Sequence, residues 1–241
     1  MVGRRERRVG AGSVVILGIV LAGCSTAPST PAGVDITTVT PTPLATTSSA
    51  AEIRDQMLNA LESNQSVHVL GSLVPQGGVT AVDVTANRLR QVRGTVTVDG
   101  VVIDVMRDGD TLYVRAPNTF WSARRPDLLP AASGKWVRMP AASPVVPELT
   151  AVLDYDRLVG PVRVSGDVTQ GPTSFLEAES VIELVTSSGS VFVRASDTPL
   201  PVALRDRAFG DLRYTEWGAA VPIPAPVPAE IAELPPSPVA S

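Results

Sequence analysis

The stretch GTVTVDGVVIDV, residues 94–105, consists of two alternating apolar runs joined by an Asp-Gly pair. Asp99-Gly100 is a preferred pair for a two-residue type I′ turn, which needs positive φ at both positions. Closing the chain there predicts an antiparallel hairpin in which Val96 lies opposite Ile103. We therefore expect the fold to be built on an antiparallel sheet.

A second Asp-Gly pair, at residues 108 and 109, predicts that a third strand continues this meander. With a two-residue turn at this pair, Val105 lies opposite Leu112. Cross-strand partners share a side of the sheet, so both turns place the same apolar residues on one face. These residues are Val96, Val98, Val101, Ile103, Val105, Leu112 and Val114.

A helix is expected on the N-terminal side of the meander, over Ala51–Glu62. Ser49 or Ser48 is suited to cap it, because a serine side chain satisfies free backbone N–H groups at a helix start. Its apolar residues follow helical spacing and form one stripe that includes Met57 and Leu61. A weaker helical pattern runs from Pro147 to about Leu153.

The rest of the chain is typical of strands, with alternation recurring in four further places. These are Val82/Val84, Val162/Val164, Val191/Val193 and Leu212/Tyr214. A long antiparallel sheet with one apolar face needs a cover, and the two expected helices are small for that task. Either the sheet curls on itself, or part of the apolar face lines a binding cavity. A solid core built from the same residues fits the periodicity equally well.

The ends of the chain differ from its middle in composition. Residues 1–23 have the order of a secretory signal, with arginines before an apolar run much shorter than the ~20 residues of a membrane span. Leu21-Ala22-Gly23-Cys24 resembles a bacterial lipobox, which implies diacylglycerol on Cys24. Residues 24–50 are rich in Ser, Thr and Pro and indicate a flexible tether. Residues 219–241 are rich in proline and indicate an extended tail, which leaves 51–218 as the folded domain.

Charge and cysteine content exclude several classes of function. Removing residues 1–23, with four arginines and one glutamate, lowers the formal net charge from −4 to −7. An acidic domain does not suit nucleic acid, which needs basic patches, or docking onto anionic headgroups. Cys24 is the only cysteine, so the domain has no intramolecular disulfide.

The sequence offers little for catalysis. His68 is the only histidine, which excludes metal sites built on paired histidines, and it lies in an apparent strand without a nucleophile-elbow motif nearby. We interpret it as a strand residue on the polar face. The expectation is a non-enzymatic protein with no cofactor and no metal site.

Aromatic residues flank a loop at 122–134 that is rich in Pro, Ala and Arg. Phe120 and Trp121 precede this loop and Trp136 follows it. Aromatic residues beside a loop can form the mouth of a cavity, or they can plug the end of a barrel. Both interpretations stay open at this point.

Several short segments, in this order, resemble actinobacterial lipoproteins of the LppX/LprG type, which share the fold of the LolA carrier. They include Ser66-Val67-His68-Val69, Thr85-Ala86-Asn87, Gly109-Asp110-Thr111-Leu112-Tyr113-Val114, Phe120-Trp121, Lys135-Trp136-Val137, Asp197 with Leu200-Pro201, and Tyr214-Thr215-Glu216-Trp217-Gly218. The resemblance spans about 52–226. It implies an α+β fold in which a curved antiparallel sheet, a half barrel, packs over a few short helices around an apolar cavity. The stretch before Val181 is shorter than in the family, which bears on the size of that cavity.

The resemblance also implies a function. Such proteins hold an acylated lipid or glycolipid, are tied to the outer face of the plasma membrane by their lipid anchor, and move cargo outward, with an envelope lipid exporter as a further partner. On that basis the residues of the apolar sheet face, with Met57 and Leu61, are the expected lipid-binding residues. The alternative is an envelope lipoprotein without cargo that acts as a scaffold or regulator through surface contacts.

Overall fold

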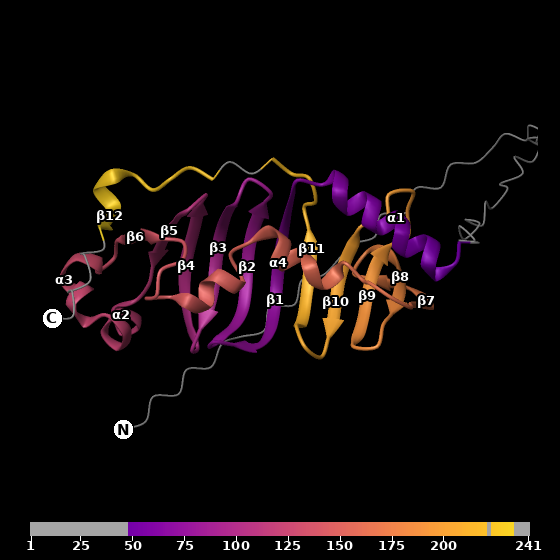
Figure 1. Cartoon of the computed structure of the whole chain (residues 1–241), viewed down its shortest axis with the longest axis horizontal. Helices are drawn as coiled ribbons and strands as arrows, with labels where there is room; N and C mark the ends of the chain where they lie inside the picture. Colours follow the sequence, from indigo (N-terminus) through magenta and orange to yellow (C-terminus); the bar gives the residue numbers. More distant parts are fainter. Residues whose placement is uncertain (1–47, 221–222, 234–241) are drawn as a thin grey trace, which may run out of the picture. The chain divides into compact units, whose positions relative to one another are not determined.

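The computed structural model describes residues 48–220 and 223–233 (Figure 1). The predicted signal segment, Cys24 and nearly all of the predicted tether lie outside the described residues. Among those described, no helix combines the length and apolar character needed to cross a membrane. The elements, in chain order, are α1 (Ala50–Ser63), β1 (Ser66–Gln76), β2 (Val79–Asn87), β3 (Gln91–Val98), β4 (Val101–Asp108), β5 (Thr111–Arg115), α2 (Asn118–Arg124), η1 (Pro126–Leu128), α3 (Leu129–Ala132), β6 (Trp136–Pro140), η2 (Pro147–Ala151), α4 (Tyr155–Val159), η3 (Gly160–Val162), β7 (Thr169–Leu176), β8 (Glu179–Val185), β9 (Gly189–Arg194), β10 (Pro201–Asp206), β11 (Gly210–Thr215), η4 (Pro228–Glu230) and β12 (Ile231–Glu233).

The described strands form one open sheet in the order β12-β6-β5-β4-β3-β2-β1-β11-β10-β9-β8-β7. Neighbouring strands are antiparallel, except that β12 runs parallel to β6. Two meanders, β1–β6 and β7–β11, join where β1 pairs with β11. Short helices lie against one face of the sheet, which we call the inner face (Figure 1). The expected α+β class with an open antiparallel sheet is confirmed.

The central hairpin has the predicted register. Val96 pairs with Ile103 and Val98 with Val101, and both turn residues, Asp99 and Gly100, have positive φ, as a type I′ turn requires.

The prediction for the next turn is wrong by one residue, which shifts the strand register by two. The turn is formed by Gly109 and Asp110, so that Val105 lies opposite Val114 rather than Leu112. A slip of two residues leaves every side chain on its face, because side chains alternate with a period of two. The predicted apolar face is therefore confirmed despite the wrong register, and its seven residues all contribute to the inner core.

Helix α1 begins where the sequence predicts and is capped by Ser49. The Ser49 hydroxyl accepts a hydrogen bond from the Glu52 N–H at 3.3 Å, and the Glu52 carboxylate accepts one from the Ser49 N–H at 2.7 Å. This reciprocal arrangement is a capping box. Ile53, Met57 and Leu61 form the buried stripe of the helix.

Replacing Ser49 by alanine is expected to destabilise the domain by about 1 kcal/mol, because the first turn loses its side-chain cap. The measurement is the urea midpoint of the folded domain. Ser48→Ala is the control, since Ser48 lies outside the capping box, and an equal loss in both variants would contradict the assignment of the cap.

The inner face is covered by the segment 147–162, which we call the covering segment. The sequence predicts a helix from Pro147 to about Leu153; the structure has the 3₁₀ helix η2 there, followed by α4 and η3. The predicted strand at Val162/Val164 is wrong, because Val162 ends η3 and both valines pack into the core from the covering layer. Two alternating valines do not distinguish a strand from a turn that faces a core.

The opposite, outer face carries two smaller apolar clusters. One consists of Met106, Tyr113 and Trp136, against which Ile223 and Ile231 pack. The predicted extended tail thus returns to the sheet, where 231–233 form the short edge strand β12. The other cluster consists of Val181, Phe192, Val202 and Ala203, with Leu176 beside it.

Candidate functional site

The nine residues predicted to line an apolar cavity lie in one continuous core between the inner face and its cover. All are buried except Val101, which is half-buried at the start of β4. They are Met57 and Leu61 of α1 with Val96, Val98, Val101, Ile103, Val105, Leu112 and Val114 of the sheet. The structure thus brings them together as one apolar layer, and their role as a cavity lining stays a prediction.

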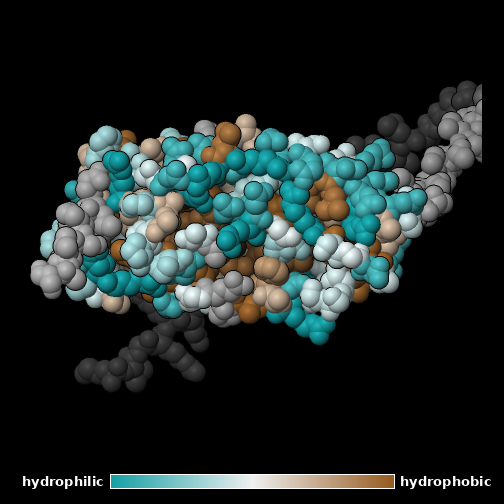
Figure 2. Space-filling model, in the orientation of Figure 1, coloured by the Kyte–Doolittle hydropathy of each residue, from teal (hydrophilic) through white to brown (hydrophobic). Residues whose placement is uncertain are grey.

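Open space lies further along the same layer, where β1 ends and β11 begins. A pocket of about 50 Å³ separates the sheet from the covering segment there. Its lining is apolar except for one arginine: Leu73, Val152, Arg157, Leu158, Pro161, Phe209 and Leu212. None of the nine predicted residues lines it. Figure 2 shows that hydrophobic residues also reach the surface in the middle of the face it presents.

Side chains that cross the core hold the covering segment over the pocket. The Tyr214 hydroxyl of β11 donates to the Leu158 carbonyl at 3.1 Å, and burial raises the pKa of Tyr214 far above its ordinary value, so this hydroxyl stays a donor. Arg107, buried on β4, donates to the Leu153 carbonyl at 2.6 Å. Asp154 caps α4. The pocket roof is therefore fixed by a few hydrogen bonds rather than by a long helix.

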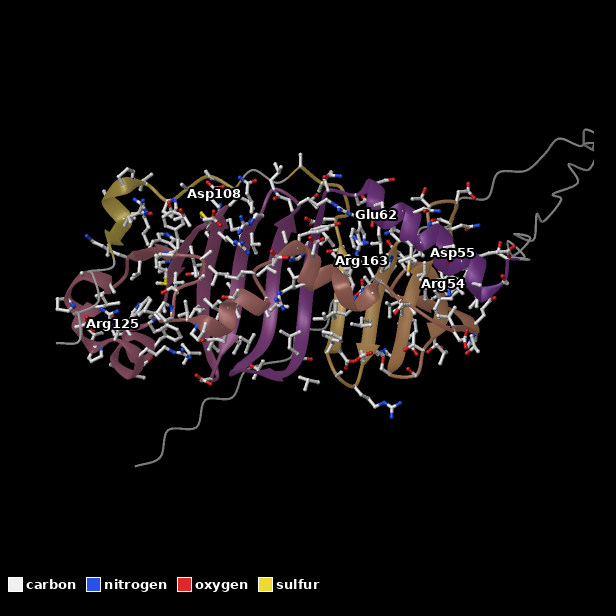
Figure 3. The ribbon with its side chains drawn as sticks, in the orientation of Figure 1. Arg54, Asp55, Glu62, Asp108, Arg125 and Arg163 are labelled. Carbon is white, nitrogen blue, oxygen red and sulfur yellow. The ribbon has the colours of Figure 1, made fainter. Side chains whose placement is uncertain are left out.

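The far side of the covering segment is tied to α1. The Tyr155 hydroxyl donates to the Asn64 carbonyl at 3.0 Å, and Arg163, just after η3, pairs with Glu62 of α1 (Figure 3). The hydrogen bond and charge of Arg163, with a contribution from Arg88, hold the pKa of Glu62 below its usual value. Helix α1 and the covering segment thus form one layer.

Arg157 is the charged residue of the pocket. It lies exposed on α4, and its guanidinium makes no hydrogen bond or ion pair with any part of the chain that the structure describes. An unpaired cation beside an apolar pocket suits a ligand with an apolar body and an anionic or polar end.

The three aromatic residues predicted at a cavity mouth do not lie together. Phe120 and Trp121 are buried in the inner core, with their rings edge to face at 5.2 Å. Trp136 belongs to the cluster on the outer face, where Arg115 lies over its ring at 4.7 Å. The Trp121 indole N–H is buried without a hydrogen-bond partner.

His68 lies on the outer face of β1, as interpreted from the sequence. Its Nδ1 is 3.1 Å from the Thr215 hydroxyl and its Nε2 is 2.7 Å from the Asp83 carboxylate. Although a hydroxyl, an imidazole and a carboxylate in a row have the composition of a catalytic triad, these three lie side by side on a flat sheet face. None of them lines the pocket. Within residues 48–220 and 223–233, no cluster of three or more His, Cys, Asp or Glu side chains is placed to hold a metal ion.

The sequence predicts the apolar residues of the inner face but not the residues of the pocket. Leu212 was placed on a strand by its alternation with Tyr214, which was the one available signal. The pocket residues of the covering segment, such as Leu158, have no strand or helix period long enough to reveal their direction. Phe209 lies in a hairpin turn, where exposure cannot be inferred from pattern.

Of the comparisons with known proteins, the one with solved structures bears on the fold. No family model matches the sequence, and no curated protein matches it. Among solved structures, LprF from Mycobacterium bovis superposes with a TM-score of 0.52 at 18% sequence identity, covering 73% of this chain and 96% of that one. The lipoprotein LppX from Mycobacterium tuberculosis gives a TM-score of 0.44 at 15% identity, with coverage of 73% and 97%. The chain therefore has the LprF-like fold, as its resemblance to the LppX/LprG lipoproteins predicts.

Proposed function

We propose that this protein is a lipoprotein of the cell envelope, anchored through Cys24 to the outer face of the plasma membrane. It binds an acylated lipid or glycolipid between the sheet and the covering segment and carries or presents it. The observation that carries this proposal is the apolar pocket between Leu73, Leu158 and Leu212, of which Leu158 and Leu212 also belong to the apolar core. The LprF-like fold and the lipobox resemblance support it.

The pocket is the entrance, and binding a long acyl chain requires the covering segment to move. A volume of about 50 Å³ holds little more than one or two water-sized groups, at ~30 Å³ each. The covering segment consists of helices of only three to five residues, and we expect such a segment to open locally at low free-energy cost. Each buried methylene then contributes about 0.8 kcal/mol, which offsets that cost as the chain enters.

Replacing Leu73 by tryptophan is expected to block the entrance and weaken acyl binding at least about tenfold, the loss of about 1.4 kcal/mol. Leu73 is only half-buried, so the larger ring can be accommodated without rebuilding the core. A tryptophan at Ile103, which is buried in the packed core of the inner face, would instead disturb folding. The matched control is Leu70→Trp, on the outer face of the same strand.

The protein for this test is the chain of residues 25–241, since all the described strand pairs and core contacts lie within 48–233. It is purified from a lipid-rich host and tested for bound lipid by native mass spectrometry, and for uptake of a fluorescent acyl probe. Absence of both in the unmodified chain would overturn the carrier proposal and favour the scaffold without cargo. Equal binding by the Leu73→Trp and Leu70→Trp variants would show that the acyl chain does not enter at Leu73.

A further inference from the structure

The turn between β10 and β11, residues 206–210, presents an apolar side chain at the pocket. Phe209 is 40% exposed and lines the pocket mouth, and its carbonyl accepts a hydrogen bond from the N–H of Val74, itself 38% exposed, at 2.9 Å. We call Val74 and residues 206–210 the hairpin tip. It lies at the lower end of β10 and β11 in Figure 1.

The hairpin tip is held in one conformation. The Asp206 carboxylate accepts hydrogen bonds from the backbone N–H groups of Ala208 at 2.7 Å and Phe209 at 3.1 Å, and from the Ser188 hydroxyl. Burial raises the pKa of Asp206, but these hydrogen bonds outweigh it and bring the pKa below its usual value. Arg207 donates to carbonyls of the neighbouring β8–β9 turn. The backbone of the turn at Phe209 is therefore fixed by hydrogen bonds while its side chain faces solvent.

Cations without a counter-ion surround the tip. Arg157, Arg205 and Arg207 have no ion pair among the described residues, whereas most of the other described arginines do, for example Arg88 with Glu62 and Arg213 with Glu177. The nearby acidic residues are Asp206, whose oxygens hold the turn and whose pKa the charge of Arg207 also lowers, Asp211, and Asp156 next to Arg157. The tip thus presents arginines that no carboxylate pairs with directly, although the chain as a whole is acidic.

An open, shallow groove of about 610 Å³ adjoins the tip on the outer face. Ser72 and Ser190 line it together with Arg205 and Arg207, as does Ser188, whose hydroxyl already donates to Asp206. Serine hydroxyls and arginines are suitable donors for phosphate oxygens. An exposed phenylalanine beside such donors matches the layered structure of a bilayer surface.

We propose that the hairpin tip docks onto an anionic bilayer, with Phe209 inserted between headgroups and the arginines on lipid phosphates, so that the pocket mouth faces the membrane. The net charge of the chain opposes such docking, whereas the arginines of the tip that lack an ion pair, together with the exposed Phe209, favour it. Each cation near an anionic surface contributes about fivefold in affinity, and a single such contact is weak. Docking combined with a lipid anchor gives the two signals that stable membrane binding needs. Docking of the hairpin tip requires no cargo, so its test is independent of the test of lipid carriage.

The test is sedimentation of the chain of residues 25–241, which lacks the anchor, with vesicles of phosphatidylcholine alone or mixed equally with phosphatidylglycerol. We expect binding to the anionic vesicles only, weakening as salt is raised. Phe209→Ser is expected to lower binding about tenfold or more, and Arg157→Gln and Arg205→Gln about fivefold each. Unchanged thermal melts show that these exposed substitutions leave the fold intact.

Two matched controls lie away from the tip. Phe175→Ser removes a 77% exposed phenylalanine next to the last residue of edge strand β7. Arg93→Gln removes an exposed arginine of β3 that has no described ion pair. Both are expected to bind as the unmodified chain does. No binding to anionic vesicles, equal binding to neutral ones, or an equal loss in the control variants would overturn the proposal.

Discussion

Replacing Gly94 by alanine is expected to destabilise the domain by ~4 kcal/mol or more, enough to remove most of the stability of a typical domain. Gly94 lies inside β3 with φ of 153°. A Cβ there would lie 2.0 Å from the Asp83 carbonyl oxygen and 2.7 Å from the Val84 Cα on the adjacent strand. These are backbone atoms in the middle of the sheet, so β2 and β3 would have to separate.

Gly100→Ala is the matched control. Gly100 also has a positive φ, of 77°, but an added Cβ there meets nothing within 4 Å. This variant should lose only the cost of the backbone conformation, about 1 kcal/mol. Urea unfolding followed by tryptophan fluorescence measures both. A similar loss in the two variants would show that conformation, not the close approach of β2, makes Gly94 necessary.

The sequence predicts local structure well where turn chemistry decides it. The register of β3 and β4 follows from Asp99-Gly100, and the start of α1 from Ser49 and Glu52, because the interactions involved join residues a few positions apart. The next turn is predicted one residue early, since Asp108-Gly109 and Gly109-Asp110 are both suitable pairs. The pairing of β1 with β11 joins residues about 140 positions apart, and no local pattern indicates it.

Strands with weak alternation could not be found from the sequence. Edge strand β7 contains Pro172 and is mostly exposed, so it has neither the residue preference nor the apolar face of a typical strand. Likewise β12 follows a proline-rich run and is a strand because it pairs with the edge of β6. Their conformation comes from the sheet they join.

The candidate site divides in the same way. The apolar floor, from Val96 to Val114, follows from alternation, because one face of a sheet must be buried. The position of the pocket depends on the covering segment, which is held by single hydrogen bonds from Tyr214 and Arg107. Hydrogen bonds between side chains and distant carbonyls leave no periodic trace in the sequence.

Arg124 holds the other end of the covering segment, and its replacement by methionine is expected to cost about 3 kcal/mol. Its Nη1 lies 2.7 Å from the Glu148 carboxylate of η2, and its Nη2 donates to Asp99 of the β3–β4 turn at 2.9 Å. The Glu148 side chain is only 5% exposed. Without Arg124, this carboxylate would be buried with no opposite charge, which is the costly outcome of breaking a buried pair.

The adjacent Arg125 provides the comparison, because it pairs with Asp127, which is 53% exposed. Arg125→Met should cost less than about 1 kcal/mol, as expected for an exposed ion pair. Thermal and urea unfolding measure both variants.

The double variant Arg124→Met/Glu148→Leu separates charge from packing. If the unpaired, buried Glu148 carboxylate causes the loss of stability, replacing it by leucine should restore most of that stability, since an apolar pair often replaces a buried ion pair without cost. If the double variant is as unstable as Arg124→Met, the loss comes instead from the packing of Arg124 over the Phe120 ring, 4.7 Å away. A restored double variant would show that the covering segment is fixed at Glu148 by charge. Opening for an acyl chain would then have to occur at its pocket end, which is held by the hydrogen bonds of Tyr214 and Tyr155 and by the ion pair of Arg163 with Glu62.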